Sequence, residues 1–452
     1  MGQNDLTKGP VFSSLCGFAL PMILGNLLQQ CYNLVDSWVV GHFVSSAALG
    51  AVGSAFALMT FLTSVLLGLC MGSGVVFSRC FGQGDRERLE HGLCASFLLT
   101  AVVTLILTVA SLLMTDAIIR WMNVPPEVVD MTRSYLTLVF CGIPAIALYN
   151  YFGAYLKALG NSVVPLAFLG LSTVLNIALD LLLVAVYPFG TAGAATATLI
   201  AQSLSGVGIT LYTFGTDRRL RQVFRTFQIK RSSLGEITSL SLLTCVQQSI
   251  MNLGILMVQG LVNSFGTVVM AAFATGVKID AFAYMPVQEF GNAFSTFIAQ
   301  NMGAEQAGRI KKGVQLGVLT VVAYCVLISL VLWFLAEPLI LIFIAPEETA
   351  VVSEGVRYLH TVGPFYSGIG CLFLLYGLYR ALGRPFISVV LTVISLGTRV
   401  ALSYTLAPLP AVGVVGIWWS IPIGWGLADL TGLLCYYKNR ERFVSFSAPH
   451  GF

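Results

Sequence analysis

Seven ionisable side chains lie inside long apolar segments of this sequence: Asp36, Asp180, Lys278, Asp280, Glu289, Arg399 and Asp429. Because an apolar environment penalises charge, ionisable residues are rare in such segments and are functional candidates wherever they occur. Two carboxyl groups close together in a poorly solvated pocket cannot both stay ionised, so the pair either holds a proton or coordinates a cation. Chemistry of this kind couples transport across a membrane to an ion gradient.

Two of the acids, Asp36 and Asp180, belong to the first half of the chain. Asn176 precedes Asp180 by one helical turn, which places both side chains on one helical face. If the apolar segments cross a membrane, a rise of 1.5 Å per residue puts Asp36, Asp180 and Thr198 at similar depth, about 6–11 Å below the outer face of that membrane. The four residues are predicted to form one cation-coupling site, for H⁺ or for Na⁺ held by the two acids. The alternative is that the acids only hydrogen-bond neighbouring helices.

The second half of the chain offers local charge neutralisation. Lys278 lies two residues before Asp280, and Arg399 lies in a later apolar segment. Asp280 is predicted to pair with Arg399 or Lys278, and a contact between these residues and a substrate stays an open alternative. Further candidates for substrate contact lie within the apolar segments, namely Tyr32, Asn33, Asn150, Gln248 and Met257.

The elements that carry these residues are apolar enough to cross a membrane. The chain is 57% hydrophobic and only 10% charged, which excludes a soluble enzyme or a nucleic-acid binder. About 20 apolar residues span a bilayer. By that rule the spans are approximately 11–40, 44–78, 93–114, 134–156, 163–187, 191–214, 234–263, 267–300, 313–335, 358–379, 386–408 and 411–437. Pro21, inside the first of these, would act as a hinge or as a static kink.

Lysine and arginine residues gather in the loops on one side of the predicted membrane, among them the long charged loop at 216–233. Such asymmetry marks the cytoplasmic side, so both termini are predicted to be cytoplasmic. The protein is expected in a cell membrane, the bacterial inner membrane.

The two halves of the chain resemble each other. Similar stretches end in Gly82 and Gly303, at an offset of 221 in the numbering, and the stretches ending in Gly160 and Gly383 match at an offset of 223. Such a repeat predicts an all-α membrane protein with twelve transmembrane helices in two pseudo-symmetric six-helix bundles around a central cleft. The expected divisions are an N-terminal lobe at 1–215, a cytoplasmic linker loop at 216–233 and a C-terminal lobe at 234–452.

Residues needed for other activities are missing from the sequence. No GxxxxGK[ST] phosphate-binding loop occurs, so ATP hydrolysis is not expected. The four histidines are scattered, which argues against a metal-dependent membrane enzyme. No cofactor is expected beyond H⁺ or Na⁺ as the coupling ion.

Several motifs resemble those of the multidrug and toxic compound extrusion (MATE) family of secondary transporters. They are QQCYNLVD at 29–36, ALGAVG at 48–53, LKALGN at 156–161, LNIALD at 175–180 and QNMGA at 300–304. In the branch similar to the DNA-damage-inducible-protein-F transporters, the resemblance implies a first-lobe cation site at Asp36, Asn176, Asp180 and Thr198. Members with acids in spans 7 and 10 use them for sodium, but span 7 here has Gln247 and Gln248 and span 10 has no acid. That departure favours protons, or a site confined to the first lobe.

The resulting prediction is a monomeric antiporter that exports amphipathic, cationic organic compounds in exchange for H⁺ or Na⁺ by alternating access. The bilayer and these small molecules are its only expected partners, and nucleic acid is not one. The alternative within transporters is a flippase for lipid-linked saccharides, which would need a cation-rich cleft for a diphosphate.

Overall fold

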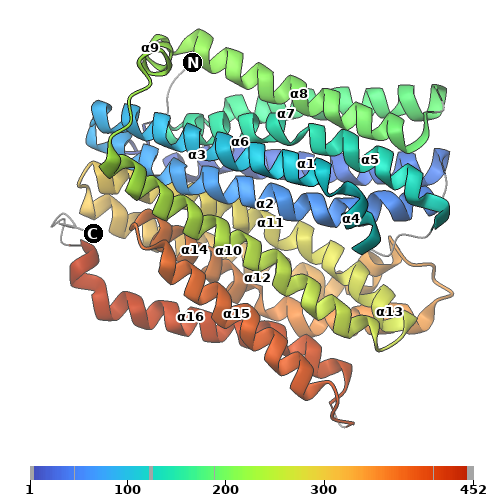
Figure 1. The fold of residues 1–452 in the computed structure, drawn as a ribbon. Helices are drawn as coiled ribbons and strands as arrows, with labels where there is room; N and C mark the ends of the chain where they lie inside the picture. The colour runs from blue at the N-terminus through green and yellow to red at the C-terminus, as the bar shows by residue number, and fades with distance from the viewer. Residues whose placement is uncertain (1–4, 45, 122–125, 188, 411, 445–452) are drawn as a thin grey trace. The chain divides into compact units, whose positions relative to one another are not determined.

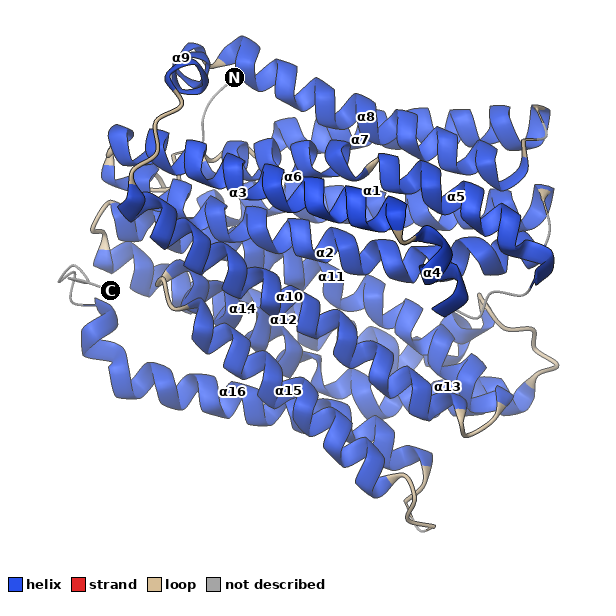
Figure 2. Ribbon diagram, in the orientation of Figure 1, coloured by secondary structure: helices blue, strands red, loops and turns tan. Residues whose placement is uncertain are grey.

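The computed structural model describes residues 5–44, 46–121, 126–187, 189–410 and 412–444. Throughout this part of the chain, every regular element is a helix, as Figure 2 shows. Helices are expected for apolar spans, because lipid offers no partner for a free backbone N–H or C=O and a helix pairs these groups internally.

The first repeat consists of short and long helical elements. They are α1 (Val11–Phe43), α2 (Ser46–Gln83), α3 (Arg86–Leu113), α4 (Thr115–Trp121), η1 (Pro126–Val128), α5 (Val129–Cys141), α6 (Ile143–Ala158), α7 (Val163–Asp180), η2 (Leu181–Val186) and α8 (Gly190–Thr216).

A short helix, α9 (Arg218–Thr226), leads to the second repeat. The remaining elements are α10 (Arg231–Asn263), α11 (Thr267–Gly303), α12 (Ala307–Leu341), α13 (Thr349–Val362), η3 (Gly363–Phe365), α14 (Tyr366–Ala381), α15 (Pro385–Leu406) and α16 (Val414–Val444). Eleven segments of the described chain are long and apolar enough to cross a membrane, and α16 is a further helix of 31 residues. The predicted spans coincide with these helices, with ends that differ by up to nine residues.

Two of the spans are broken at matching places. The fourth is divided at Gly142 between α5 and α6, and the tenth is divided by η3 between α13 and α14. Pro144 lies in the first turn of α6 and Pro364 lies inside η3, where their missing N–H groups cost no helical hydrogen bond. Both repeats therefore interrupt the same helix.

The turns also repeat. Gly84 (φ 69°) follows α2, and Glu305 (φ 55°) follows α11 at an offset of 221 in the numbering. Gly160 (φ 83°) and Gly383 (φ 71°) follow α6 and α14 at an offset of 223. The left-handed region is strained for residues with a Cβ, so its recurrence at equivalent positions supports the predicted duplication.

Contacts divide the chain into two compact units whose bounds differ from the lobes expected from sequence. Unit 1 is formed mainly by Leu20–Cys245, and unit 2 by Leu6–Ala19 together with the chain from Val246 onward. The helices α1 and α10 each pass from one unit into the other, at Leu20 and at Val246. The region 216–233 contains α9 rather than loop alone, and it belongs to unit 1.

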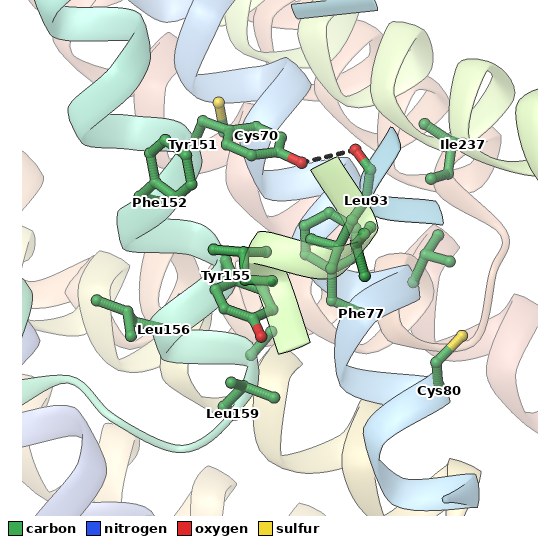
Figure 3. Packing of buried hydrophobic residues seen from close by; sticks show 14 of the residues in the cluster. Cys70, Phe77, Cys80, Leu93, Tyr151, Phe152, Tyr155, Leu156, Leu159 and Ile237 are labelled. Carbon is green, nitrogen blue, oxygen red and sulfur yellow. Dashed lines mark hydrogen bonds between the residues drawn. The ribbon is translucent and has the colours of Figure 1, made fainter. Parts of the chain in front are cut away.

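The core of unit 1 is built from aromatic and aliphatic side chains, with hydroxyls that are hydrogen-bonded (Figure 3). Tyr151 packs edge-to-face on Phe77 and donates its hydroxyl to the Leu93 carbonyl at 2.8 Å. Cys70 and Cys80 are buried in the same cluster. Both pack there as small apolar side chains.

In unit 2, one arginine holds the segment that precedes α1. The Arg309 guanidinium, at the start of α12, donates to the carbonyls of Leu6 (2.8 Å), Lys8 (3.1 Å) and Gly9 (2.6 Å) and to Asn301 Oδ1 (2.9 Å). The Leu6 N–H donates to Gln300 Oε1 at 3.1 Å, and Leu6 is fully buried. The start of α1 is thus fixed to α11 and α12 of the second repeat.

In unit 1, the start of α10 is held in a comparable way. Arg88, on α3, donates to Glu236 Oε2 at 2.6 Å, and Arg79 lies 3.7 Å from the same carboxylate. Close helix packing adds to this contact, since a Cβ at Gly72 would lie 2.5 Å from the Ser241 Cα. Only glycine permits that approach of α2 to α10.

Candidate functional site

The four residues predicted to couple to a cation all lie in unit 1 and are all buried. Asp36 lies on α1 with 8% of its surface exposed, Asn176 (1%) and Asp180 (0%) lie on α7, and Thr198 (4%) lies on α8. Three helices that are separate in sequence therefore supply the candidate site.

The hydroxyl of Thr198 connects these helices. Its Oγ1 accepts from Asn176 Nδ2 at 3.4 Å and from the Tyr32 hydroxyl at 3.4 Å. Tyr32 is one turn before Asp36 on α1, so one threonine oxygen bridges α1, α7 and α8. Asn176 was predicted as part of the coupling site and Tyr32 as a candidate for substrate contact, and the structure places both beside Thr198.

Four further acceptor oxygens of the site have no hydrogen-bond donor among the described residues. They are Asp36 Oδ1, Asn176 Oδ1 and both carboxylate oxygens of Asp180, and all four are buried. In the described residues no lysine, arginine or histidine forms an ion pair with either acid. Buried acceptors normally find partners, so four orphaned oxygens in one place are unusual.

The two acids lie within electrostatic reach of each other, and two tyrosine hydroxyls lie within reach of both. One of these tyrosines, Tyr135 on α5, was not among the candidates from sequence. A signal for it existed, because Tyr135-Leu136 recurs as Tyr358-Leu359 at the repeat offset.

Local backbone geometry sets the position of Asp180. The α-helix α7 ends at Asp180 and continues as the π-helix η2, a wide turn that is rare and frequent at functional sites. Gly193 on α8 allows this segment to pack closely, since a Cβ there would lie 2.6 Å from the Leu183 carbonyl oxygen. Asp180 is therefore held at a junction that a larger residue at 193 would disturb.

The oxygen atoms that line this site are suitable ligands for a proton or a small hard cation. Carboxylate, amide and hydroxyl oxygens are the ligands that such cations prefer, whereas transition metals favour nitrogen and sulfur. Among the described residues, no group of three or more His, Cys, Asp or Glu side chains could hold a metal. The orphaned oxygens of Asp36, Asn176 and Asp180 are the atoms that would receive the ion.

Other candidates in the first half lie on the same helices or on α6. The Asn33 carbonyl accepts from the Ser37 hydroxyl at 2.9 Å, and Asn150 donates to the Ile146 carbonyl at 2.9 Å. Pro21 lies inside α1, one residue after the chain passes from unit 2 into unit 1.

In unit 2, Asp280 is buried on α11 and accepts hydrogen bonds from two tyrosine hydroxyls, Tyr358 on α13 and Tyr366 on α14. The cations that were expected to pair with Asp280 form no ion pair with it among the described residues. Lys278 is exposed, with its ammonium 5.8 Å from the Phe343 ring centroid. Residues two apart on a helix do not face each other, which explains why it misses Asp280.

Arg399, on α15, lies within electrostatic reach of Asp280 but forms no ion pair with it in the described part of the chain. Its Nε is buried without a partner. Asp280 is therefore held by hydroxyls rather than by a cation, and Tyr358 and Tyr366 were missed from sequence.

The remaining candidates of the second half have other surroundings. Gln248 is half-buried on α10, Met257 is exposed, and the Met257 carbonyl accepts from Tyr404 at 3.5 Å. Glu289 accepts from Asn292 at 3.3 Å.

Comparison with known proteins decides the family. The family model MatE matches residues 21–182 and, a second time, residues 242–405. The chain belongs to the MatE family. It is a transporter and not an enzyme, as the resemblance of its motifs implied. The double match also agrees with the duplication seen in sequence and turns.

Relatives in the MatE family carry transporter names. The chain is 28% identical to the "Probable multidrug resistance protein YpnP" of Bacillus subtilis, over 87% of this chain and 88% of that protein. It is 24% identical to a "FAD transporter" of Shewanella oneidensis, over 96% of each.

The fold is that of solved MATE transporters. An outward-facing multidrug resistance MATE transporter superposes with a TM-score of 0.90 at 21% identity, over 99% of both chains. The twelve-helix prediction is thereby confirmed. The narrower resemblance to the DNA-damage-inducible-protein-F branch stays a prediction.

Proposed function

We propose that this protein is an antiporter that exports amphipathic organic cations in exchange for H⁺ or Na⁺, with the coupling ion bound at Asp36, Asn176, Asp180 and Thr198. The observation that supports the site most is the set of orphaned oxygens on Asp36, Asn176 and Asp180, buried in one unit without a basic partner. The protein acts in the cell membrane with both termini in the cytoplasm.

The coupling ion acts by compensating charge. Two buried carboxylates repel each other, and a proton or Na⁺ between them removes that repulsion. Because Thr198 already receives hydrogen bonds from Asn176 and Tyr32, an ion drawn to Asn176 Oδ1 and the acids tightens the contact of α1 with α7 and α8. An ion that binds one conformation of these helices better than another shifts the balance between them, which is the requirement for antiport.

The polar interior favours a cationic substrate over a diphosphate. Within the spans, five acids outnumber Lys278 and Arg399, and Lys278 is exposed beside Phe343. A flippase for lipid-linked saccharides would require several cations around a diphosphate. The name of the Shewanella oneidensis relative makes FAD, an anionic compound, the informative comparison substrate.

The test is transport in proteoliposomes with imposed proton or sodium gradients, applied separately. Ethidium is expected to move against one of the two gradients, and FAD is not. Asp36→Asn and Asp180→Asn should each abolish gradient-driven movement of ethidium, because each removes one charge that attracts the ion.

Asp130→Asn is the matched control, since Asp130 is an exposed acid paired with Arg133. It should transport as the unmodified protein does. Transport of ethidium that needs neither gradient, or normal exchange by both site variants, would refute the coupling site. Gradient-driven movement of FAD in place of ethidium would refute the substrate class.

A further inference from the structure

The short helix α9 between the two repeats is amphipathic. Its apolar residues recur at helical spacing, and Leu220 (1% exposed) and Val223 (5%) are buried in the core of unit 1. Phe224 packs edge-to-face on Phe97 and Phe214, with ring centroids 5.0 and 5.3 Å apart. The opposite face carries exposed arginines, namely Arg218, Arg219, Arg221 and Arg225.

Hydrogen bonds fix the beginning of this helix. Asp217 caps it, because its Oδ1 accepts from the backbone N–H groups of Arg219 (3.0 Å) and Leu220 (3.3 Å). The other carboxylate oxygen accepts from the hydroxyl of Tyr155, a buried residue of α6, at 2.7 Å. The arginine face is thus presented by a rigid element rather than by a flexible loop.

From the length of the preceding span, we expect α9 to lie at the depth of the lipid headgroups. The preceding span, α8, has 27 residues, which at 1.5 Å per residue gives about 40 Å against a hydrocarbon core of about 30 Å. The helix is thus long enough for its last residue, Thr216, to lie outside the hydrocarbon, and Asp217 alone separates Thr216 from α9. Figure 1 draws α9 nearly end-on while α8 runs across the view, so α9 lies across the direction of the span.

The charge of the arginine face is largely uncompensated. Arg218 and Arg225 form no ion pair with a carboxylate of the described residues, and Arg221 donates to the Gly215 carbonyl at 3.1 Å. Of the two cations that follow the helix, Lys230 pairs with Glu87 and Arg231 is exposed.

An aromatic residue closes the helix next to these charges. Phe227 adopts φ 40°, a conformation that is a genuine outlier for a bulky side chain, and the residue is 39% exposed. Amphipathic helices that lie on a membrane combine basic residues on the polar face with aromatic residues at the boundary.

We propose that the arginine face of α9, with Phe227 beside it, binds the headgroups of anionic phospholipids in the cytoplasmic leaflet. The apolar face is already occupied by the core of unit 1, so the helix docks to lipid through charge rather than by insertion. Phosphate groups accept hydrogen bonds from arginine in a bidentate manner, and basic residues near a membrane surface are attracted to anionic lipid.

The test compares two variants that each lose three positive charges. Arg218→Gln, Arg221→Gln and Arg225→Gln together remove the proposed surface. The control combines Arg86→Gln, Lys311→Gln and Lys312→Gln, which are exposed cations near the starts of α3 and α12 on the same predicted side. All six residues are exposed, so both proteins are expected to fold.

The purified full-length protein in a neutral detergent is titrated with phosphatidylglycerol or phosphatidylcholine, and bound lipid is counted by native mass spectrometry. Phosphatidylglycerol should bind more tightly than phosphatidylcholine, and its apparent Kd should rise roughly fivefold for each arginine of α9 removed. The control variant should keep its affinity. Amide hydrogen exchange of 218–226 in nanodiscs should be slower with an equal mixture of the two lipids than with phosphatidylcholine alone.

Three outcomes would overturn the proposal. They are equal affinity for the two lipids, equal loss in both triple variants, which would indicate an effect of net charge alone, and exchange of 218–226 that is independent of lipid composition. Ethidium exchange by the α9 variant is scored separately, so a failure of the coupling-site proposal does not decide this one.

Discussion

Arg88 and Arg309 occupy equivalent positions in the two repeats, at the offset of 221 that also relates the preceding turns, and each binds the beginning of a long helix. Arg88 donates a hydrogen bond to the Glu236 carboxylate at the start of α10. Arg309 instead donates to three backbone carbonyls of the segment before α1. The position is shared, and the chemistry of its partner differs.

The Arg309 contacts predict a local loss of structure on truncation. Arg309→Ala removes four hydrogen bonds and leaves Asn301 Oδ1 and three carbonyls without that donor. A single hydrogen bond from a charged donor contributes about 1.5–3 kcal/mol to stability. The free energy of unfolding should therefore fall by at least one such amount. Amide hydrogen exchange at residues 6–12 should become faster. Lys311→Ala, an exposed neighbour on α12, should leave that exchange unchanged, and equal effects of the two would contradict the assignment.

The hydroxyl oxygen of Thr198 is predicted to be needed for binding of the coupling ion. Thr198→Val keeps the shape of the side chain but removes the acceptor shared by Asn176 and Tyr32, leaving two donors without it. One such change costs about 1–3 kcal/mol, so binding of the coupling ion should weaken by about tenfold or more. Isothermal titration with Na⁺, or proton uptake on addition of substrate, measures this. Thr210→Val is the matched control on α8, because the Thr210 hydroxyl donates to the carbonyl of Gly206 within the same helix.

Gly193 is predicted to tolerate no side chain. In Gly193→Ala the new Cβ would lie 2.6 Å from the Leu183 carbonyl oxygen, so α8 and η2 must separate. Overpacking of this kind typically costs about 1–3 kcal/mol and would also move Asp180. Thermal unfolding in detergent should show a lower midpoint. Gly260→Ala serves for comparison, since nothing lies within 4 Å of a Cβ at that helical position, and it should be neutral or slightly stabilising.

The two tyrosines around Asp280 are predicted to stabilise unit 2. Tyr358→Phe or Tyr366→Phe deletes one donor to the buried carboxylate, which should lower the free energy of unfolding by about 1–3 kcal/mol. The double variant should lose more than either single variant, because the carboxylate then keeps neither of these hydroxyl donors. Chemical unfolding monitored by tryptophan fluorescence provides the measurement. Tyr404→Phe, at a half-exposed tyrosine, should change little, and a comparable loss there would argue against a special role for the pair.

Sequence was sufficient for the spans because hydropathy averaged over a bilayer-spanning length is a strong signal, and the helices from Val11 to Val444 follow the predicted segments. The breaks at Gly142 and η3 were not predicted, since a single short interruption hardly changes the hydropathy of a window. The helix α9 was also missed, because a short run of charged and apolar residues between spans resembles a loop when no buried partner for Leu220 and Val223 is known.

Depth and helical spacing in the sequence grouped Asp36, Asn176, Asp180 and Thr198 as one candidate site. The structure places all four residues in one unit. Partners that depend on tertiary packing could not be predicted. Lys278 and Arg399 were the predicted partners of Asp280, yet its donors are hydroxyls from α13 and α14, whose distance from α11 along the chain hides the contact. Tyr135 needed the repeat offset to be noticed at all.

The passage of α1 and α10 from one unit into the other has a consequence for how the two halves can be separated. Each repeat contributes its opening segment to the unit built mainly by the other repeat, which is the exchange of equivalent elements seen in domain-swapped dimers. A chain cut between α9 and α10 would yield two fragments that each lack a segment completing their own unit. Each half therefore needs the other to complete its unit, although the two halves have similar sequences.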